Sequence, residues 1–142
     1  MTLTLPSTEV HVPLLTRLTI RLLVRVAGAL SKRKPAAIQR FLGTLSRGAR
    51  AGDYAAVSRA RDEILTVSAA CRGSAACLPR SLSVVLLCRL RGLWADWCVG
   101  VLVEPPFMAH AWVEAEGLIV DEPLEHDELK TLFRVSAASK PV

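Results

Sequence analysis

Apolar residues in the first half of the chain recur every three or four positions, which is the spacing of an α-helix with one apolar side. The first stretch follows Pro13 and has three arginines on a neighbouring stripe; its apolar positions are Leu14, Leu15, Leu18, Leu22, Val26 and Ala29. A second stretch begins at Pro35, which suits a first helical turn, and a third follows Asp53, a residue type that caps helices. After an irregular N-terminal segment over residues 1–12, the chain up to residue 69 is therefore predicted to be mainly helical.

In the second half of the chain, the spacing of apolar residues changes from every three or four positions to every second position. A loop over residues 71–74 leads to a fourth helical stretch, which starts near Cys77 and ends at Gly92. Apolar and polar residues then alternate, as is typical of β-strands; the strand candidates cover residues 96–103, 108–114 and 118–121, and residues 127–135 fit either a short helix or a strand. A frayed tail is expected from Ser136. Helices followed by short strands predict an α+β fold.

Size and charge narrow the class of protein. A chain of 142 residues with 51% hydrophobic residues can bury one real core, so a single domain over residues 1–142 is expected. The net charge of +5 is unevenly spread, because the cations gather in residues 1–61 and the acids in residues 104–128. This split indicates a surface for an acidic partner or for another protein, or simply the solvated faces of amphipathic helices. The basic half has few aromatic residues on which bases could stack, so no nucleic-acid partner is predicted.

Arg17, Arg21 and Arg25 interrupt the most apolar segment, so it is too short to span a membrane, and no secretory cleavage pattern follows it. The sequence therefore predicts a cytoplasmic protein without membrane insertion, whose four cysteines are reduced. These cysteines are dispersed and form no C-x-x-C pair, so we expect neither a zinc site nor another cofactor.

The candidate chemistry consists of Cys77, His110 and Asp121, in that order along the chain. A thiol near the start of a helix has a lowered pKa, which a nearby imidazole lowers further. If Val113 faces Leu118 across the hairpin turn, His110 lies opposite Asp121; a turn at residues 116–117 makes the two diagonal neighbours on one face.

Each of these residues also has a structural interpretation. Cys77 fits a small buried apolar residue, His110 a satisfied core histidine, and Asp121 the end of a strand. Cys71 is the rival nucleophile, but it lies in the preceding loop without a helix dipole. His126 is the rival base, and its acidic neighbours indicate a solvated loop.

The run Cys77-Leu78-Pro79-Arg80-Ser81-Leu82, then Leu90-Arg91-Gly92 and Ala109-His110-Ala111-Trp112-Val113-Glu114, resembles the transglutaminase-like cysteine peptidases of lasso-peptide biosynthesis. The resemblance covers about residues 70–125. It implies a papain/transglutaminase-like fold, in which N-terminal helices precede a catalytic core over residues 70–135 and a nucleophile helix packs on a small antiparallel sheet. It also implies a catalytic triad of Cys77, His110 and Asp121.

The resemblance further implies a leader peptidase that cuts a precursor peptide through a thioester, before a separate ATP-dependent cyclase closes the ring. The chain is similar to the stand-alone peptidase half of such systems, which implies a separate leader-recognition protein as partner. Two other classes stay open: an acyl transferase that passes the thioester to an amine, and a scaffold or binding module without catalysis.

Overall fold

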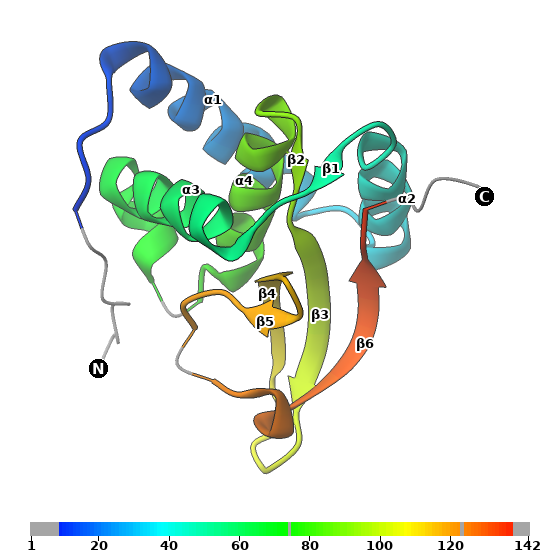
Figure 1. Cartoon of the computed structure of the whole chain (residues 1–142). Coiled ribbons are helices and arrows are strands. Elements are labelled where there is room, and N and C mark those ends of the chain that lie inside the picture. The colour runs from blue at the N-terminus through cyan, green and yellow to red at the C-terminus, as the bar shows by residue number, and fades with distance from the viewer. Residues whose placement is uncertain (1–8, 74, 123, 138–142) are drawn as a thin grey trace.

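Four α-helices form where apolar residues recur with helical spacing (Figure 1). The computed structural model describes residues 9–73, 75–122 and 124–137. The helices are α1 (Leu14–Leu30), α2 (Pro35–Leu45), α3 (Tyr54–Val67) and α4 (Cys77–Leu90), with 3₁₀ turns η1 (Ala69–Arg72) and η2 (His126–Glu128). The predicted helices, three before residue 69 and a fourth that starts near Cys77, are confirmed.

The helix boundaries follow the predicted signals. Pro35 occupies the first turn of α2. The side chain of Asp53 accepts a hydrogen bond from the Ala56 N–H at 2.7 Å, which caps α3. Gly92 follows α4 with φ of 78°, a left-handed conformation that glycine adopts without a steric penalty.

The apolar stripe predicted for α1 faces solvent rather than the core. Its members are among the most exposed large apolar residues: Leu14 72%, Leu15 79%, Leu18 53%, Leu22 62% and Val26 42%. Ile20 and Ala27 are fully buried, and Leu23, Val24 and Leu30 pack partly against the core. α1 therefore has two apolar sides, and its contacts with α3 and α4 decide which one is buried.

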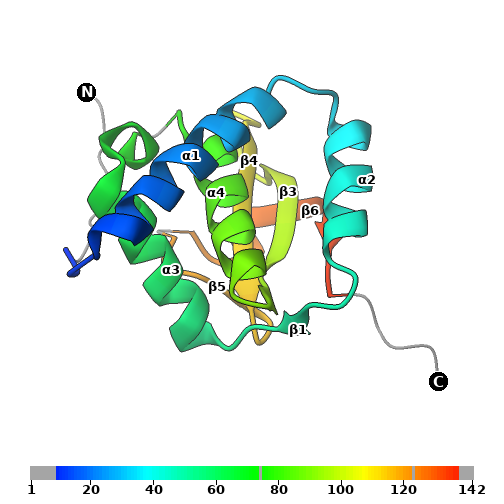
Figure 2. The ribbon, with the colours of Figure 1, turned by 90° about the horizontal axis from the view of Figure 1, so that it is seen from above.

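α4 is the central element of the fold. It contacts α1 and α3 on one side and the strands of the sheet on the other, as the two views show (Figures 1 and 2). Residues 80–88 are all buried, including the charged Arg80. A helix that is apolar over most of its surface needs such an environment, because it has no side suited to water.

The main sheet is antiparallel, with strand order β5-β4-β3-β6. Its strands are β3 (Asp96–Leu102), β4 (Ala109–Ala115), β5 (Leu118–Ile119) and β6 (Leu129–Val135). β1 (Arg50–Ala51) and β2 (Leu93–Trp94) form a separate parallel pair. Four helices with an antiparallel sheet packed against α4 confirm the predicted α+β class.

The sequence left open whether residues 127–135 form a short helix or a strand. Residues 129–135 form a strand, which pairs with β3. The register shifts between Val99 and Gly100, where the main chain of β6 approaches closely. A Cβ atom on Gly100 would lie 2.1 Å from the Lys130 carbonyl oxygen, so this position requires glycine.

Two predicted segments fall at least partly outside the described residues. They are the irregular N-terminal segment, over residues 1–8, and the frayed tail, over residues 138–142.

The β4–β5 hairpin turns at Glu116 and Gly117, which both have positive φ, at 55° and 76°. Glu114 pairs with Ile119 and Ala115 with Leu118, which is the register of the two-residue turn at 116–117. β5 then ends at Ile119, and Asp121 has a φ of 48°. The chain thus leaves the sheet before Asp121, and strand geometry no longer determines where its side chain lies.

Within the described residues, no helix is long and apolar enough to cross a membrane. All four cysteines are described, and each is a free thiol.

Candidate active site

Cys77 is the first residue of α4 and is half-buried. Backbone N–H groups in a first helical turn have no partner within the helix, so they favour negative charge nearby. The other three cysteines are buried, with Cys71, Cys88 and Cys98 at most 1% exposed. Burial raises the pKa of Cys88 to about 12 and also raises that of Cys98. Cys77 is therefore the thiol best suited to react.

His110 lies on β4, beside the start of α4. Its ring stacks on Trp112 with centroids 6.0 Å apart, and its side chain is 16% exposed. The imidazole and the Ala111 N–H both lower the pKa of the Cys77 thiol, and Cys77 and His110 line the same cavity. Within the described residues, β5 pairs only with Glu114 and Ala115 at the far end of β4, so β5 does not pair with the stretch that carries His110.

The carboxylate beside His110 belongs to Glu122. Its Oε2 lies 3.7 Å from His110 Nε2, and the Glu122 side chain is only 6% exposed. The Asp121 carboxylate instead accepts hydrogen bonds from Tyr54 and Ser58 on α3, and Asp121 is exposed. The structure thus joins Asp121 to α3 and gives His110 a different carboxylate neighbour, Glu122, while the catalytic role of Asp121 stays a prediction.

Two buried guanidinium groups surround Glu122. Arg80 Nη2 lies 3.4 Å from Glu122 Oε1, and Arg80 is 3% exposed. Arg61 on α3 is also 3% exposed, and its positive charge favours the ionised form of Glu122. Burial raises the pKa of Glu122, but His110, Arg80 and Arg61 outweigh burial, and the net pKa lies below its ordinary value. Glu122 is therefore ionised at neutral pH.

A similar balance between burial and neighbouring charges sets the pKa values of Cys77 and His110. Burial raises the pKa of the Cys77 thiol, but the neighbouring His110 and the Ala111 N–H outweigh burial and the net pKa is lowered. Burial lowers the pKa of His110, whereas Cys77 and Glu122 raise it to about 9. A thiolate facing an imidazolium is the reactive state of a cysteine nucleophile.

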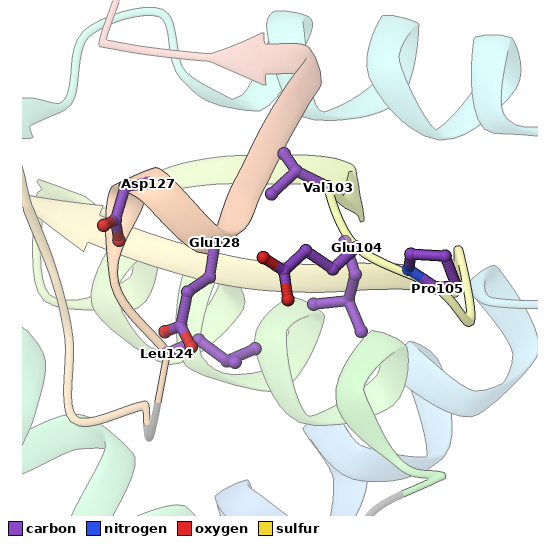
Figure 3. A pocket seen from close by; sticks show the side chains of 7 residues that line it. Val103, Glu104, Pro105, Leu124, Asp127 and Glu128 are labelled. Atoms are coloured by element: carbon purple, nitrogen blue, oxygen red, sulfur yellow. The ribbon is translucent and has the colours of Figure 1, made fainter.

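One cavity adjoins Cys77 and His110, and a second cavity lies next to the first. One, of about 230 Å³, is lined by Cys77 and His110 together with apolar side chains such as Met108. A second, of about 320 Å³, shares Leu102 and Leu124 with the first. Figure 3 shows Glu104 extending from the β3–β4 loop into this second cavity toward Glu128. The cavity beside the thiol is therefore mainly apolar, whereas the second cavity is lined by the acidic residues Glu104, Asp127 and Glu128.

The remaining histidines lie elsewhere. His126 Nε2 lies 3.4 Å from Glu114 Oε2, in a cluster where the buried Glu114 also accepts hydrogen bonds from Trp112 and Arg134. His11 is exposed in the segment before α1. Neither Glu122 nor Arg80 was predicted as a site residue from the sequence. The presence of two adjacent carboxylates was the only signal for Glu122, and only the backbone conformation at Asp121 decides between them.

A family model described as the transglutaminase-like superfamily matches residues 20–134. No curated protein and no solved structure matches the chain. The match covers α2 to α4, most of α1 and nearly all of the sheet, including Cys77, His110 and Glu122. Members of this superfamily are typically cysteine hydrolases or transferases. With its thiol at a helix start and its imidazole on the adjacent strand, the chain belongs to the transglutaminase-like superfamily.

Proposed function

We propose that this protein is a cysteine peptidase that removes the leader from the ribosomally made precursor of a lasso peptide. The observation that carries the peptidase part is the half-buried pair of Cys77 and His110, with Glu122 beside the imidazole and a cavity lined by the thiol. The precursor class rests on the resemblance of the motifs around Cys77 and His110 to lasso-peptide leader peptidases.

In the proposed reaction, the Cys77 thiolate attacks the carbonyl carbon of the scissile peptide bond, and a C–S bond forms. Backbone N–H groups at the start of α4 stabilise the negative oxygen. The intermediate collapses as the C–N bond breaks, and the His110 imidazolium gives its proton to the leaving amine. His110 then takes a proton from water, whose oxygen attacks the thioester, and the Cys77 thiolate leaves.

The third catalytic residue has two candidates. The 3.7 Å separation from His110 supports Glu122 as the carboxylate that orients the imidazole and stabilises its charge. The resemblance points to Asp121, which remains a prediction. Because the two residues are adjacent, Glu122→Gln and Asp121→Asn form a matched pair of variants for this question.

The partners are also proposed: the precursor with its leader, a leader-recognition protein, and the ATP-dependent cyclase that receives the product. The exposed stripe of α1 supports a docking role for that helix, because large apolar side chains there face solvent beside Arg21 and Arg25. Reversing the charges of Arg17, Arg21 and Arg25 should weaken leader-dependent cleavage without slowing alkylation of Cys77. Unchanged leader-dependent cleavage in this triple variant would contradict a docking role for α1.

The decisive experiment combines a candidate precursor and recognition protein with the wild type, Cys77→Ala or Cys71→Ala, and follows the products by mass spectrometry. Wild type and Cys71→Ala should release the leader. Cys77→Ala should not, although it should still bind the precursor. Cleavage by Cys77→Ala would refute the proposal.

An acyl transferase remains the second candidate, because superfamily membership fits transfer of the thioester to an amine as well as to water. Mass spectrometry with an added primary amine distinguishes them: a peptidase yields the free acid, and a transferase yields the amide. A scaffold without catalysis would keep its cellular function in the Cys77→Ala variant.

A further inference from the structure

Arg80 is a charged residue in the middle of the fold. It lies three residues after Cys77, in the first turn of α4, and is only 3% exposed. A buried guanidinium is costly unless its donors are paired, so its position requires an explanation.

The partners of Arg80 join the two halves of the candidate active site. Nη1 donates to the carbonyl oxygens of Cys71 and Gly73, each at 3.1 Å, in the segment that leads to the nucleophile. Nη2 lies 3.4 Å from Glu122 Oε1, while the other oxygen of Glu122 faces His110. One planar group thus contacts the segment before the thiol and the carboxylate behind the imidazole.

We infer that Arg80 is a positioning residue, which fixes the Cys77 thiol and the His110 imidazole relative to each other by tying the segment before Cys77 to Glu122. Cys77 moves with Arg80 because they share one helical turn. His110 is oriented by Glu122, which Arg80 holds. The inference rests on the proposed cysteine chemistry of this site, but not on the identity of the peptide that is cut.

An arginine suits this role better than a lysine. Its donors lie in a rigid plane and point in fixed directions, whereas a lysine has one nitrogen that cannot span both sets of partners. Arg61 does not duplicate the role. It approaches Glu122 and Asp121 from α3, but its Nε and Nη2 have no hydrogen-bond partner among the described residues, so it supplies charge without a fixed contact.

The test is the pH dependence of Cys77 alkylation by iodoacetate, which requires no peptide substrate. The rate should rise through a low inflection, where the thiolate forms, and fall near pH 9, where His110 loses its proton. In Arg80→Met the low inflection should move up by about one pH unit, which slows alkylation by about fivefold at the pH of the wild-type inflection and by about tenfold well below it. Cys77→Ala gives the blank for the three buried cysteines.

Arg89→Met is the matched control. Arg89 lies on the same helix and also donates to two backbone carbonyls, those of Leu45 and Arg47, far along the chain from the nucleophile. This variant should lose stability but keep the wild-type pH profile.

Arg80→Lys separates positioning from charge, and it decides the question if Arg80→Met does not fold. Positioning predicts that the folded lysine variant still has a raised low inflection. A wild-type profile in Arg80→Lys would overturn the inference, because charge alone would then suffice. If the profile changes as expected but no peptide is cut, the Arg80 inference stands and the proposed peptidase function fails.

Discussion

Replacing Glu122 by Gln should lower the upper pH limit of Cys77 reactivity. The Glu122 carboxylate lies 3.7 Å from His110 Nε2, where two unit charges interact by about 4 kcal/mol at an effective dielectric constant of about 20. This energy equals about three pKa units, and burial of the imidazole opposes it. Cys77 also contributes to the raised pKa of His110, which is about 9. We therefore expect the pKa of His110 to fall by about one to two units in Glu122→Gln.

The pH window follows from the direction of each shift. A raised pKa keeps His110 protonated until the pH approaches about 9, and the lowered pKa of Cys77 keeps the thiolate present at lower pH than for an ordinary thiol. In Glu122→Gln the upper limit moves down, so the rate of iodoacetate alkylation at pH 8 should fall about two- to tenfold. The rate at pH 6 should change by less than about twofold.

Asp121→Asn removes a charge one residue away and is the control. Asp121 bonds to Tyr54 and Ser58, so this variant should keep the wild-type upper limit. If Asp121→Asn lowers the limit and Glu122→Gln does not, the assignment from the family resemblance is correct and the geometric argument is refuted.

Three further variants test the packing that supports the site, each by urea unfolding. Gly100→Ala should destabilise by more than about 2 kcal/mol, because the new methyl group would lie 2.1 Å from a carbonyl oxygen of β6; Gly43→Ala, with nothing within 4 Å, should not destabilise, and equal effects would contradict the argument. Glu114→Gln should cost about 1–3 kcal/mol, since a carboxylate that is 1% exposed accepts the Trp112 N–H at 2.8 Å; a change below about 0.5 kcal/mol would contradict this. Asp53→Ala should cost about 1 kcal/mol through loss of the α3 cap, and unchanged stability would show that the cap contributes nothing.

Local sequence signals predicted the helices well, because Pro35, Asp53 and Gly92 act within a few residues of their own position. They could not orient α1, whose two apolar stripes are equally suited to burial until α3 and α4 are placed beside it. They also missed β1 and β2, which have two residues each and depend on pairing between distant segments.

The short range of local sequence signals also explains which residues of the candidate site could be predicted. Cys77 and His110 were identifiable because a helix start and a strand define their surroundings. The turn at residues 116–117 was one of the predicted alternatives for the hairpin. However, side chains alternate between the two faces of a sheet only within a strand, and β5 ends at Ile119. The choice between Asp121 and Glu122 depends on one left-handed residue beyond that end.

Because α4 is buried between the other elements, the helix that carries Cys77 can open only when the whole domain unfolds. Because this helix carries Cys77 and contacts α1, α3 and the sheet, separating any of these layers exposes its core residues. Backbone amides in the middle of α4 should therefore be among the slowest in the protein to exchange with deuterium, at rates set by complete unfolding. A covalent inhibitor on Cys77 that also fills the adjoining cavity should raise the melting temperature of the whole chain, so thermal shift assays can identify ligands of this site before any substrate is known.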